Sequence, residues 1–239
     1  MRRRWRRRPR QLEIQWETPR PPRWQPTTNR PAVRRRVPHT ARPAINGPAH
    51  VVLRVCRNLP TLRSPKVYRV LERAFRDGKS KKGFQLVEFS IQHDHLHLVV
   101  EADHRRKLAR GIQGLMIRIA KRLNRHWRRR VGRVFADRYF ALALVKRNQL
   151  WRTLRYVLNN GRKHGAWSAK DRPDPYSSGK WFLRWMQLYC FRRPTRPPPV
   201  EMPHRYELLA LPAISLDDMP GPRHFSDGES IESLIAAVS

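Results

Sequence analysis

The sequence has little cysteine and no long apolar run, and each shortage excludes a class of protein. Cys56 and Cys190 are the only two cysteines among 239 residues, and neither belongs to a Cys/His spacing typical of zinc sites. This excludes a disulfide-dense secreted domain and favours reduced thiols in a cytoplasmic protein. No stretch of ~18 apolar residues occurs, so the sequence predicts no membrane span and no membrane partner.

Acidic residues are also scarce. The chain has 18 aspartates and glutamates against 52 lysines and arginines, a formal net charge of +34. A charge so one-sided repels itself in a compact state and indicates a polyanionic partner, most simply nucleic acid. We therefore expect a DNA-associated protein, found with the nucleoid in a bacterial cytoplasm.

Charge and proline divide the chain into three segments. Residues 1–47 hold 14 arginines and eight prolines with a net charge of +12, which predicts a disordered basic arm. Residues 194–239 hold eight prolines and seven acids against three basic residues, which predicts a disordered acidic tail. Residues 48–193 carry a net charge of +26 with five prolines, so we expect them to form the folded domain.

The hydrophobic pattern of this domain predicts four strands and three helices. Short β-branched or alternating runs predict strands at 50–56, 84–92, 95–102 and 134–145. Apolar residues at helical spacing predict helices at 66–77, 105–130 and 149–163. The order β-α-β-β-α-β-α is the ferredoxin-like pattern, an α+β fold. We therefore expect an antiparallel sheet with its helices on one face.

Histidines alternate with other residues where the third predicted strand begins. In the run from Gln92 to Val100, strand alternation places His93, His95 and His97 on one face and the leucines on the other. Cα atoms two residues apart in a strand are ~6.6 Å apart, so two such rings can converge on one metal ion. A surface pair or a hydrogen-bonded core pair is the alternative, and a metal site would need a third ligand from elsewhere.

A tyrosine lies among polar residues in the last predicted helix. At 100° per residue, the apolar stripe consists of Leu150, Trp151, Leu154, Val157 and Leu158. Tyr156 falls opposite this stripe, on the side of Arg152, Asn160 and Lys163. The pattern predicts a tyrosine outside the core, beside cations that can hold a phosphate. A half-exposed tyrosine on a basic helix is the alternative.

Three motifs of the domain together resemble those of one family. They are His95-Leu-His97, Gly132-Arg-Val-Phe-Ala-Asp-Arg-Tyr139 and Tyr156-Val-Leu-Asn-Asn-Gly-Arg-Lys-His-Gly165. In this combination and order of elements, the sequence resembles the single-tyrosine HUH transposases, most closely the REP-associated tyrosine transposases. The resemblance covers residues 48–166 and neither terminal segment.

The resemblance implies a role for each motif residue. His95 and His97 would bind a divalent metal, Mg²⁺ or Mn²⁺, with Asn160 as the third ligand and Tyr156 as the nucleophile. The substrate would be single-stranded DNA beside a hairpin. Attack by the tyrosine would leave a 5′-phosphotyrosine link and a free 3′-OH, so that strands are rejoined without ATP. The implied function is that of a metal-dependent tyrosine DNA endonuclease and strand transferase, a DNA transposase.

Cations on two predicted helices are candidate contacts to the DNA phosphates. They are Arg152 and Lys163 beside the tyrosine, and Arg118, Lys121, Arg122 and Arg125 on the long helix. Two alternatives are a non-catalytic DNA-binding relative and a structural protein of the ribosome or nucleoid. The intact candidate site argues against the first, and a need for divalent metal would exclude the second. The active form would be a monomer or a homodimer.

Overall fold

The computed structural model describes residues 45–129, 132–169, 171–183, 185, 194–203, 212 and 214. They form, in order, β1 (Gly47–Arg54), α1 (Pro65–Gly78), β2 (Ser80–Lys81), β3 (Phe84–Ile91), β4 (His95–Ala102), α2 (Arg105–His126), β5 (Phe140–Ala143), α3 (Arg147–Lys163) and the short 3₁₀ helix η1 (Ser178–Trp181). The predicted order of elements is confirmed, with β2 and η1 as additions. None of the helices in these ranges has the length and apolar character needed to cross a membrane.

The strands form one antiparallel sheet in the order β2-β3-β4-β1-β5. This is the strand order of the ferredoxin-like pattern, so the predicted α+β class is confirmed. The strand predicted at 134–145 is shorter than expected. Only 140–143 pairs continuously, whereas Phe135 makes an isolated bridge to Val55.

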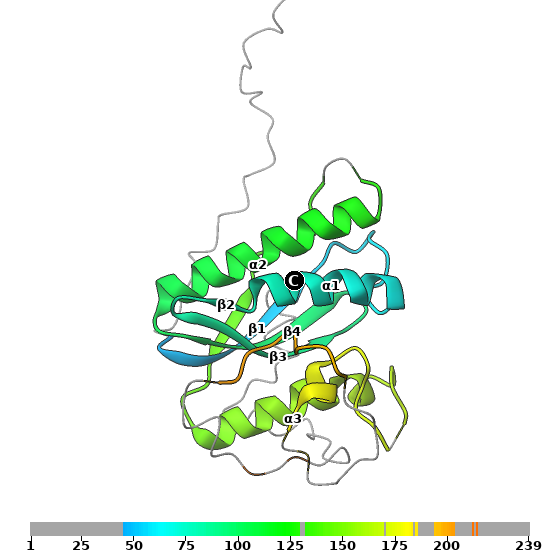
Figure 1. Cartoon of the computed structure of the whole chain (residues 1–239). Coiled ribbons are helices and arrows are strands. Elements are labelled where there is room, and N and C mark those ends of the chain that lie inside the picture. The colour runs from blue at the N-terminus through cyan, green and yellow to red at the C-terminus, as the bar shows by residue number, and fades with distance from the viewer. Residues whose placement is uncertain are drawn as a thin grey trace, which may run out of the picture. The chain divides into compact units, whose positions relative to one another are not determined.

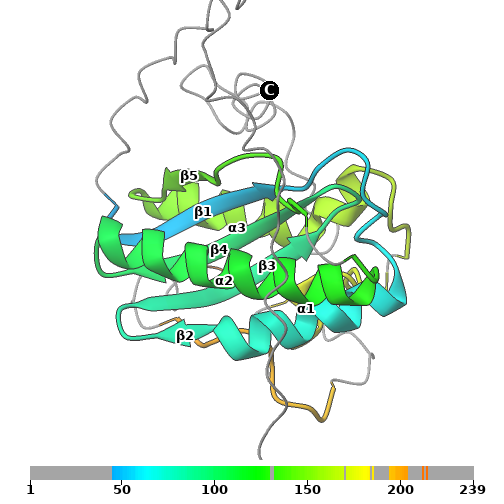
Figure 2. The ribbon, with the colours of Figure 1, turned by 90° about the horizontal axis from the view of Figure 1, so that it is seen from above.

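Helices cover both faces of the sheet, which corrects the prediction that they share one face. Helices α1 and α2 lie on one face and α3 on the other, as Figures 1 and 2 show. The first face packs residues such as Val51 and Leu98 under α1 and α2. The second face offers Val87 and Val99 to the apolar stripe of α3. Because α1 and α2 already occupy the first face, α3 buries its stripe against the second.

A later segment covers the outer edge of β3. The backbone amide of Glu201 donates to the Leu86 carbonyl at 2.8 Å, and Val200 is buried in the core beneath α1 and α2. Residues 194–203, predicted to belong to a disordered tail, therefore form part of the fold. The physical reason is that a strand edge with unpaired backbone groups and an apolar site for Val200 both accept this segment.

The two predicted tails otherwise lie almost entirely outside the described residues. The arm predicted for 1–47 overlaps them only at 45–47, where Ile45 is buried and Gly47 begins β1. Of the tail beyond residue 203, only residues 212 and 214 are described. The arm and the remainder of the acidic tail stay predictions.

A buried ion pair joins the end of α3 to the end of β3. The Arg63 guanidinium donates to both carboxylate oxygens of Asp174, at 2.8 and 2.9 Å, and to the Ile91 carbonyl at 2.8 Å. The side chains of Arg63 and Asp174 are 4% and 1% exposed. Gly161 lies directly against this carboxylate, and a Cβ atom there would overlap Asp174 Oδ2. The pair therefore holds the last turns of α3 in place.

Replacing Asp174 by asparagine is expected to lower the free energy of unfolding by about 3–5 kcal/mol, because it leaves the Arg63 charge buried without a counterion. Urea unfolding followed by circular dichroism measures this loss. Asp171→Asn is the matched control. It removes an exposed carboxylate paired with Arg172 and should cost no more than about 1 kcal/mol. Equal losses in the two variants would contradict the role of the buried pair.

Candidate functional site

His95 and His97 point from β4 toward the face that carries α3. Leu96 and Leu98 point to the other face and join the core under α1 and α2, so the predicted alternation is confirmed. The Nε2 atoms of the two histidines lie 3.0 Å apart. His95 Nδ1 lies 2.7 Å from Asp94 Oδ1, and this hydrogen bond lowers the pKa of Asp94. Since a carboxylate only accepts, the neutral form of His95 carries its proton on Nδ1 and its lone pair on Nε2.

Tyr156 lies in α3 with its ring against His97. The two ring centroids are 5.2 Å apart and the ring planes are nearly perpendicular. The Lys163 ammonium lies 4.9 Å from the centroid of the tyrosine ring, within the range of a cation–π contact. The nucleophile predicted from the sequence is therefore brought to the predicted metal ligands.

The exposure predicted for Tyr156 is wrong, because the residue is 2% exposed. The helical wheel assumed a single buried side, yet every residue from Tyr156 to Gly161 is buried. The sheet covers one side of α3, while Phe182, Trp185 and Ile214 pack in the same cluster as its apolar residues. Tyr156, on the polar side of the helix, is buried with its ring against His97 of the sheet.

Asn160 lies one turn after Tyr156 and is fully buried. Both atoms of its amide, Oδ1 and Nδ2, lack a hydrogen-bond partner within the part of the chain that the structure describes. Burial lowers the pKa of His97 well below 6.5, with smaller contributions from His95, His50, His164 and Lys163. The end of α3 therefore lies near His97. A buried polar group without a partner is costly, which favours a ligand at Asn160.

These residues fit a divalent metal ion. Two ligands ~2.1 Å from an octahedral ion and at right angles to each other are ~3.0 Å apart, which is the spacing of the two Nε2 atoms. Within the described ranges, no group of three or more His, Cys, Asp or Glu side chains is suited to a metal. A third protein ligand would therefore be of another type, and the buried Asn160 amide, whose Oδ1 has no hydrogen-bond partner among the described residues, is a candidate.

The structure separates the two groups of cations predicted to bind DNA. Arg152 and Lys163 belong to α3 and thus to the side of Tyr156. The cations of the other group are Arg118, Lys121, Arg122 and Arg125, on α2. Helix α2 lies across the sheet from α3 (Figure 1). The two groups would contact different parts of a DNA molecule, and their role in binding stays a prediction.

His50 belongs to the site and was missed from the sequence. It is fully buried, its Nε2 atom lies 3.1 Å from His97 Nδ1, and its ring meets that of Tyr156 edge-on. Burial, together with a smaller effect of the nearby His95, lowers the pKa of His50 to about 3. Alternation along β1 could have indicated its direction, because Val51 on its flank faces the first core. Its partner depends on strand pairing, which the sequence does not reveal.

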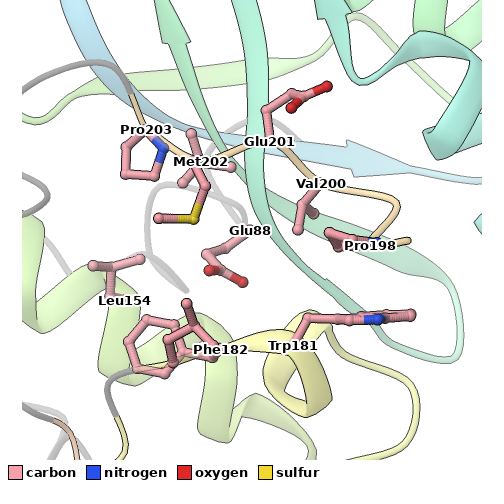
Figure 3. Close-up of a pocket in the computed structure, with 11 residues that line it drawn as sticks. Glu88, Leu154, Trp181, Phe182, Pro198, Val200, Glu201, Met202 and Pro203 are labelled. Atoms are coloured by element: carbon pink, nitrogen blue, oxygen red, sulfur yellow. The ribbon is translucent and has the colours of Figure 1, made fainter. Parts of the chain in front are cut away.

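Glu88 is a second buried polar residue that the sequence analysis missed. It interrupts the apolar strand β3, and its carboxyl group points into a pocket formed with residues that include Leu154, Phe182 and Met202 (Figure 3). The Ser178 hydroxyl donates to this carboxyl group. Burial raises the pKa of Glu88 from 4.5 to about 8, although the bond from Ser178 opposes the shift. A single acid within an apolar strand was the available signal.

In the wild type, the free energy of unfolding is expected to decrease as pH rises, and Glu88→Gln should reduce this decrease. Because the pKa of Glu88 is about 8 in the folded protein against 4.5 ordinarily, the folded form holds a proton that the unfolded form loses between these values. Wild-type stability therefore decreases as pH rises through this window. At ~1.4 kcal/mol per pKa unit, the variant should gain on the order of 4 kcal/mol over wild type from about pH 4 to about pH 9.

Urea unfolding at both ends of this pH range measures the effect. Glu201→Gln is the control at the mouth of the same pocket, because its partly exposed carboxylate pairs with Lys79 at 3.1 Å. This control should keep the wild-type pH slope. Parallel pH profiles for wild type and Glu88→Gln would contradict the shifted pKa.

A comparison with known protein families finds a match to the part of the chain that contains the candidate site. Residues 45–160 match the model of the family described as transposase IS200 like. The match includes His95, His97, Tyr156 and Asn160. No curated protein matches the chain.

Two solved structures are similar to the chain. One is a REP-associated tyrosine transposase bound to a REP hairpin, with 15% identity, coverage of 59% of this chain and 82% of that one, and a TM-score of 0.46. The other is a putative transposase from Deinococcus radiodurans, with 18% identity, coverage of 46% and 88%, and a TM-score of 0.35. The similarity to transposases therefore rests on the family match over residues 45–160, which is just under half of the chain.

Proposed function

We propose that this chain is a DNA transposase that cuts and rejoins single-stranded DNA beside a hairpin, with Tyr156 as its nucleophile. The family match supports a transposase, and the net charge of +34 supports a nucleic acid substrate. The hairpin follows from the sequence resemblance to the REP-associated tyrosine transposases. A monomer or a homodimer would carry out the reaction.

The observation that carries this proposal is the contact between Tyr156 and His97. The two residues come from α3 and β4, and their ring centroids are 5.2 Å apart. On its far side from His50, His97 presents Nε2 to His95 Nε2 at 3.0 Å. A core that served packing alone would not bury facing imidazole nitrogens and an unpartnered amide, because such groups cost stability. In a metal-dependent phosphoryl-transfer site, such groups would serve as ligands of the ion.

The proposed reaction conserves the energy of the phosphodiester bond. The Tyr156 oxygen attacks the DNA phosphorus in line, the bond from phosphorus to the 3′-oxygen breaks, and that oxygen leaves as a 3′-OH after taking up a proton. The phenol proton is released, and the 5′ end of the cut strand is then joined to the tyrosine. A 3′-OH reverses these steps and seals a strand, so no nucleotide cofactor is required.

His95, His97 and Asn160 would hold the divalent ion, Mg²⁺ or Mn²⁺. When bound, the ion would stabilise negative charge on the non-bridging oxygens of the phosphate. Lys163 favours the negative charge that develops on the Tyr156 oxygen, because its ammonium lies 4.9 Å from the ring centroid. Arg152, one turn before the tyrosine, is in sequence position to contact the same phosphate.

Trapping of a covalent adduct tests this function. Single-stranded hairpin oligonucleotides with flanking segments, labelled at one end or the other, would be incubated with the full chain and Mg²⁺, Mn²⁺ or EDTA. We expect a denaturation-resistant adduct with metal only. It should retain a 3′-end label and release a 5′-end label, because the tyrosine takes the 5′ end of the cut strand. A fully duplex oligonucleotide of the same sequence should give none.

Two outcomes would contradict the proposal. Retention of the 5′-end label would mean that the opposite bond is cut. Tight hairpin binding without cleavage in any metal would favour the non-catalytic DNA-binding alternative.

A further inference from the structure

His50 is a buried histidine for which the proposed reaction has no role so far. It lies on β1, and its ring plane makes an angle of only 17° with that of His97, with centroids 5.2 Å apart. The Nε2 atom of His50 lies 3.1 Å from Nδ1 of His97. It also meets the Tyr156 ring edge-on, with centroids 6.2 Å apart. His50 therefore touches both a proposed ligand and the proposed nucleophile.

The two nitrogens of His97 have different partners. Nε2 faces His95 and Nδ1 faces His50. An ion held between the Nε2 atoms of His95 and His97 lies on the side of His97 away from the contact with His50. His50 is therefore not a ligand of that ion in this arrangement. It is placed instead to control where His97 carries its proton.

We propose that His50 is a positioning residue for His97, whose Nδ1–H donates to His50 Nε2 and so keeps the His97 Nε2 lone pair free for a metal. This inference rests on the proposed function, because it assumes the ion at His95 and His97. Both rings are fully buried, and burial favours the neutral form that has a lone pair to offer.

Without metal, the same hydrogen bonds run in the opposite sense. Asp94 keeps the His95 proton on Nδ1, so His95 Nε2 accepts and His97 Nε2–H donates. His97 Nδ1 then accepts from His50 Nε2–H. With a metal bound, His97 Nε2 would have lost its proton, the shared proton would lie on His97 Nδ1 instead of His50 Nε2, and His50 Nδ1 would have taken up a proton. One proton leaves and one enters, so the charge of the three rings is unchanged.

The surroundings of His50 determine which of its two nitrogens carries the proton in the metal-free protein. Its Nδ1 atom is buried and has no hydrogen-bond partner among the residues that the structure describes. A proton there is unfavourable, whereas a proton on Nε2 has His97 as its partner. The metal-free form should therefore hold the His50 proton on Nε2, and the metal-bound form should hold it on Nδ1.

Nitrogen-15 NMR of the histidine-labelled full chain tests the reversal without any substitution. Long-range proton–nitrogen spectra identify the protonated nitrogen of each ring before and after saturation with Mg²⁺, which is diamagnetic. We expect His50 and His97 both to change from the Nε2–H to the Nδ1–H tautomer. The exposed His104 and His126 are internal references and should not change.

Metal affinity measured on variants tests the same inference independently. Mn²⁺ binding to the DNA-free protein would be followed by calorimetry in wild type, His50→Phe and His50→Gln. The Phe variant keeps a ring beside His97 but offers no acceptor, and should bind Mn²⁺ about 10- to 100-fold more weakly. The Gln variant places an amide oxygen near the former Nε2 position and should recover most of this loss.

The outcomes separate this inference from the proposed function. Wild-type protein that binds no Mn²⁺ would overturn both. Normal Mn²⁺ binding by wild type with unchanged tautomers, or with equal affinity in all three proteins, would overturn the role of His50 alone. If His50→Phe does not fold, the tautomers of wild type and the affinity of His50→Gln still decide the question.

Discussion

Replacement of Tyr156 by phenylalanine is expected to abolish the covalent protein–DNA adduct. The change removes only the oxygen that forms the bond to phosphorus. The loss should exceed the ~10²–10⁴-fold that general acid–base help contributes, because no other group can take over the covalent step. Single-turnover cleavage and adduct yield on a hairpin substrate measure it.

The fold should survive this substitution, so loss of activity will not reflect unfolding. The phenylalanine ring keeps the contacts of the tyrosine ring, whose centroid lies 5.2 Å from the centroid of the His97 ring and 4.9 Å from the Lys163 ammonium. Tyr139→Phe is the matched control, since this tyrosine packs partly buried against the other core, just before β5. It should form the adduct at the wild-type rate. An adduct formed by Tyr156→Phe would exclude Tyr156 as the nucleophile.

The second large effect is expected from the double substitution His95→Ala, His97→Ala. It removes both imidazole ligands proposed for the ion, so metal-dependent cleavage should fall below detection. Hairpin binding should remain within a few fold of wild type, because phosphate contacts from lysine and arginine supply most of the affinity. Cleavage assays in Mg²⁺ and Mn²⁺, together with binding measured in EDTA, separate the two quantities.

His93→Ala is the control for the histidine pair. His93 belongs to the same run of sequence, but it is exposed and its Nδ1 atom bonds the Thr61 hydroxyl at 3.0 Å. Its substitution should leave cleavage unchanged. Full activity of the double variant would refute the proposed ligands, and loss of hairpin binding in the same variant would show that the histidines serve the structure.

The sequence was sufficient for those parts of the site that depend on local periodicity. Strand alternation predicts the common face of His95 and His97, because the period of two residues is a property of the extended backbone. The spacing from Tyr156 to Asn160 likewise puts two side chains one helical turn apart. The order of strands and helices follows from the hydrophobic pattern in the same way.

Features that depend on long-range packing could not be predicted from the sequence. Tyr156 is buried with its ring against His97 and His50 of the sheet, and a helical wheel contains no such neighbours. His50 comes beside His97 only through the register of β1 on β4, in which Val52 pairs with His97. One histidine in an apolar strand gives no indication of that partner.

Which helix covers which face of the sheet also could not be predicted from the sequence. The sequence predicts three amphipathic helices, but it does not say that α1 and α2 together fill one face and leave only the second for α3. Val87 and Val99, which receive α3, belong to a face that otherwise carries polar side chains such as Glu88 and His97. A face of this composition is typical of a sheet that has one side in solvent, so the pattern did not indicate that a helix covers it.

Identification of the residue that carries the DNA tests the central claim most directly. The adduct trapped with a hairpin substrate and Mg²⁺ or Mn²⁺ would be digested with nuclease and trypsin and analysed by mass spectrometry. Trypsin cuts after Arg155 and after Arg162 and so releases the peptide 156–162, which contains Tyr156 and no other tyrosine. We predict a residual nucleotide joined through its 5′-phosphate to Tyr156 in this peptide. A nucleotide on any other peptide, or cleavage that leaves no modified peptide, would contradict the account.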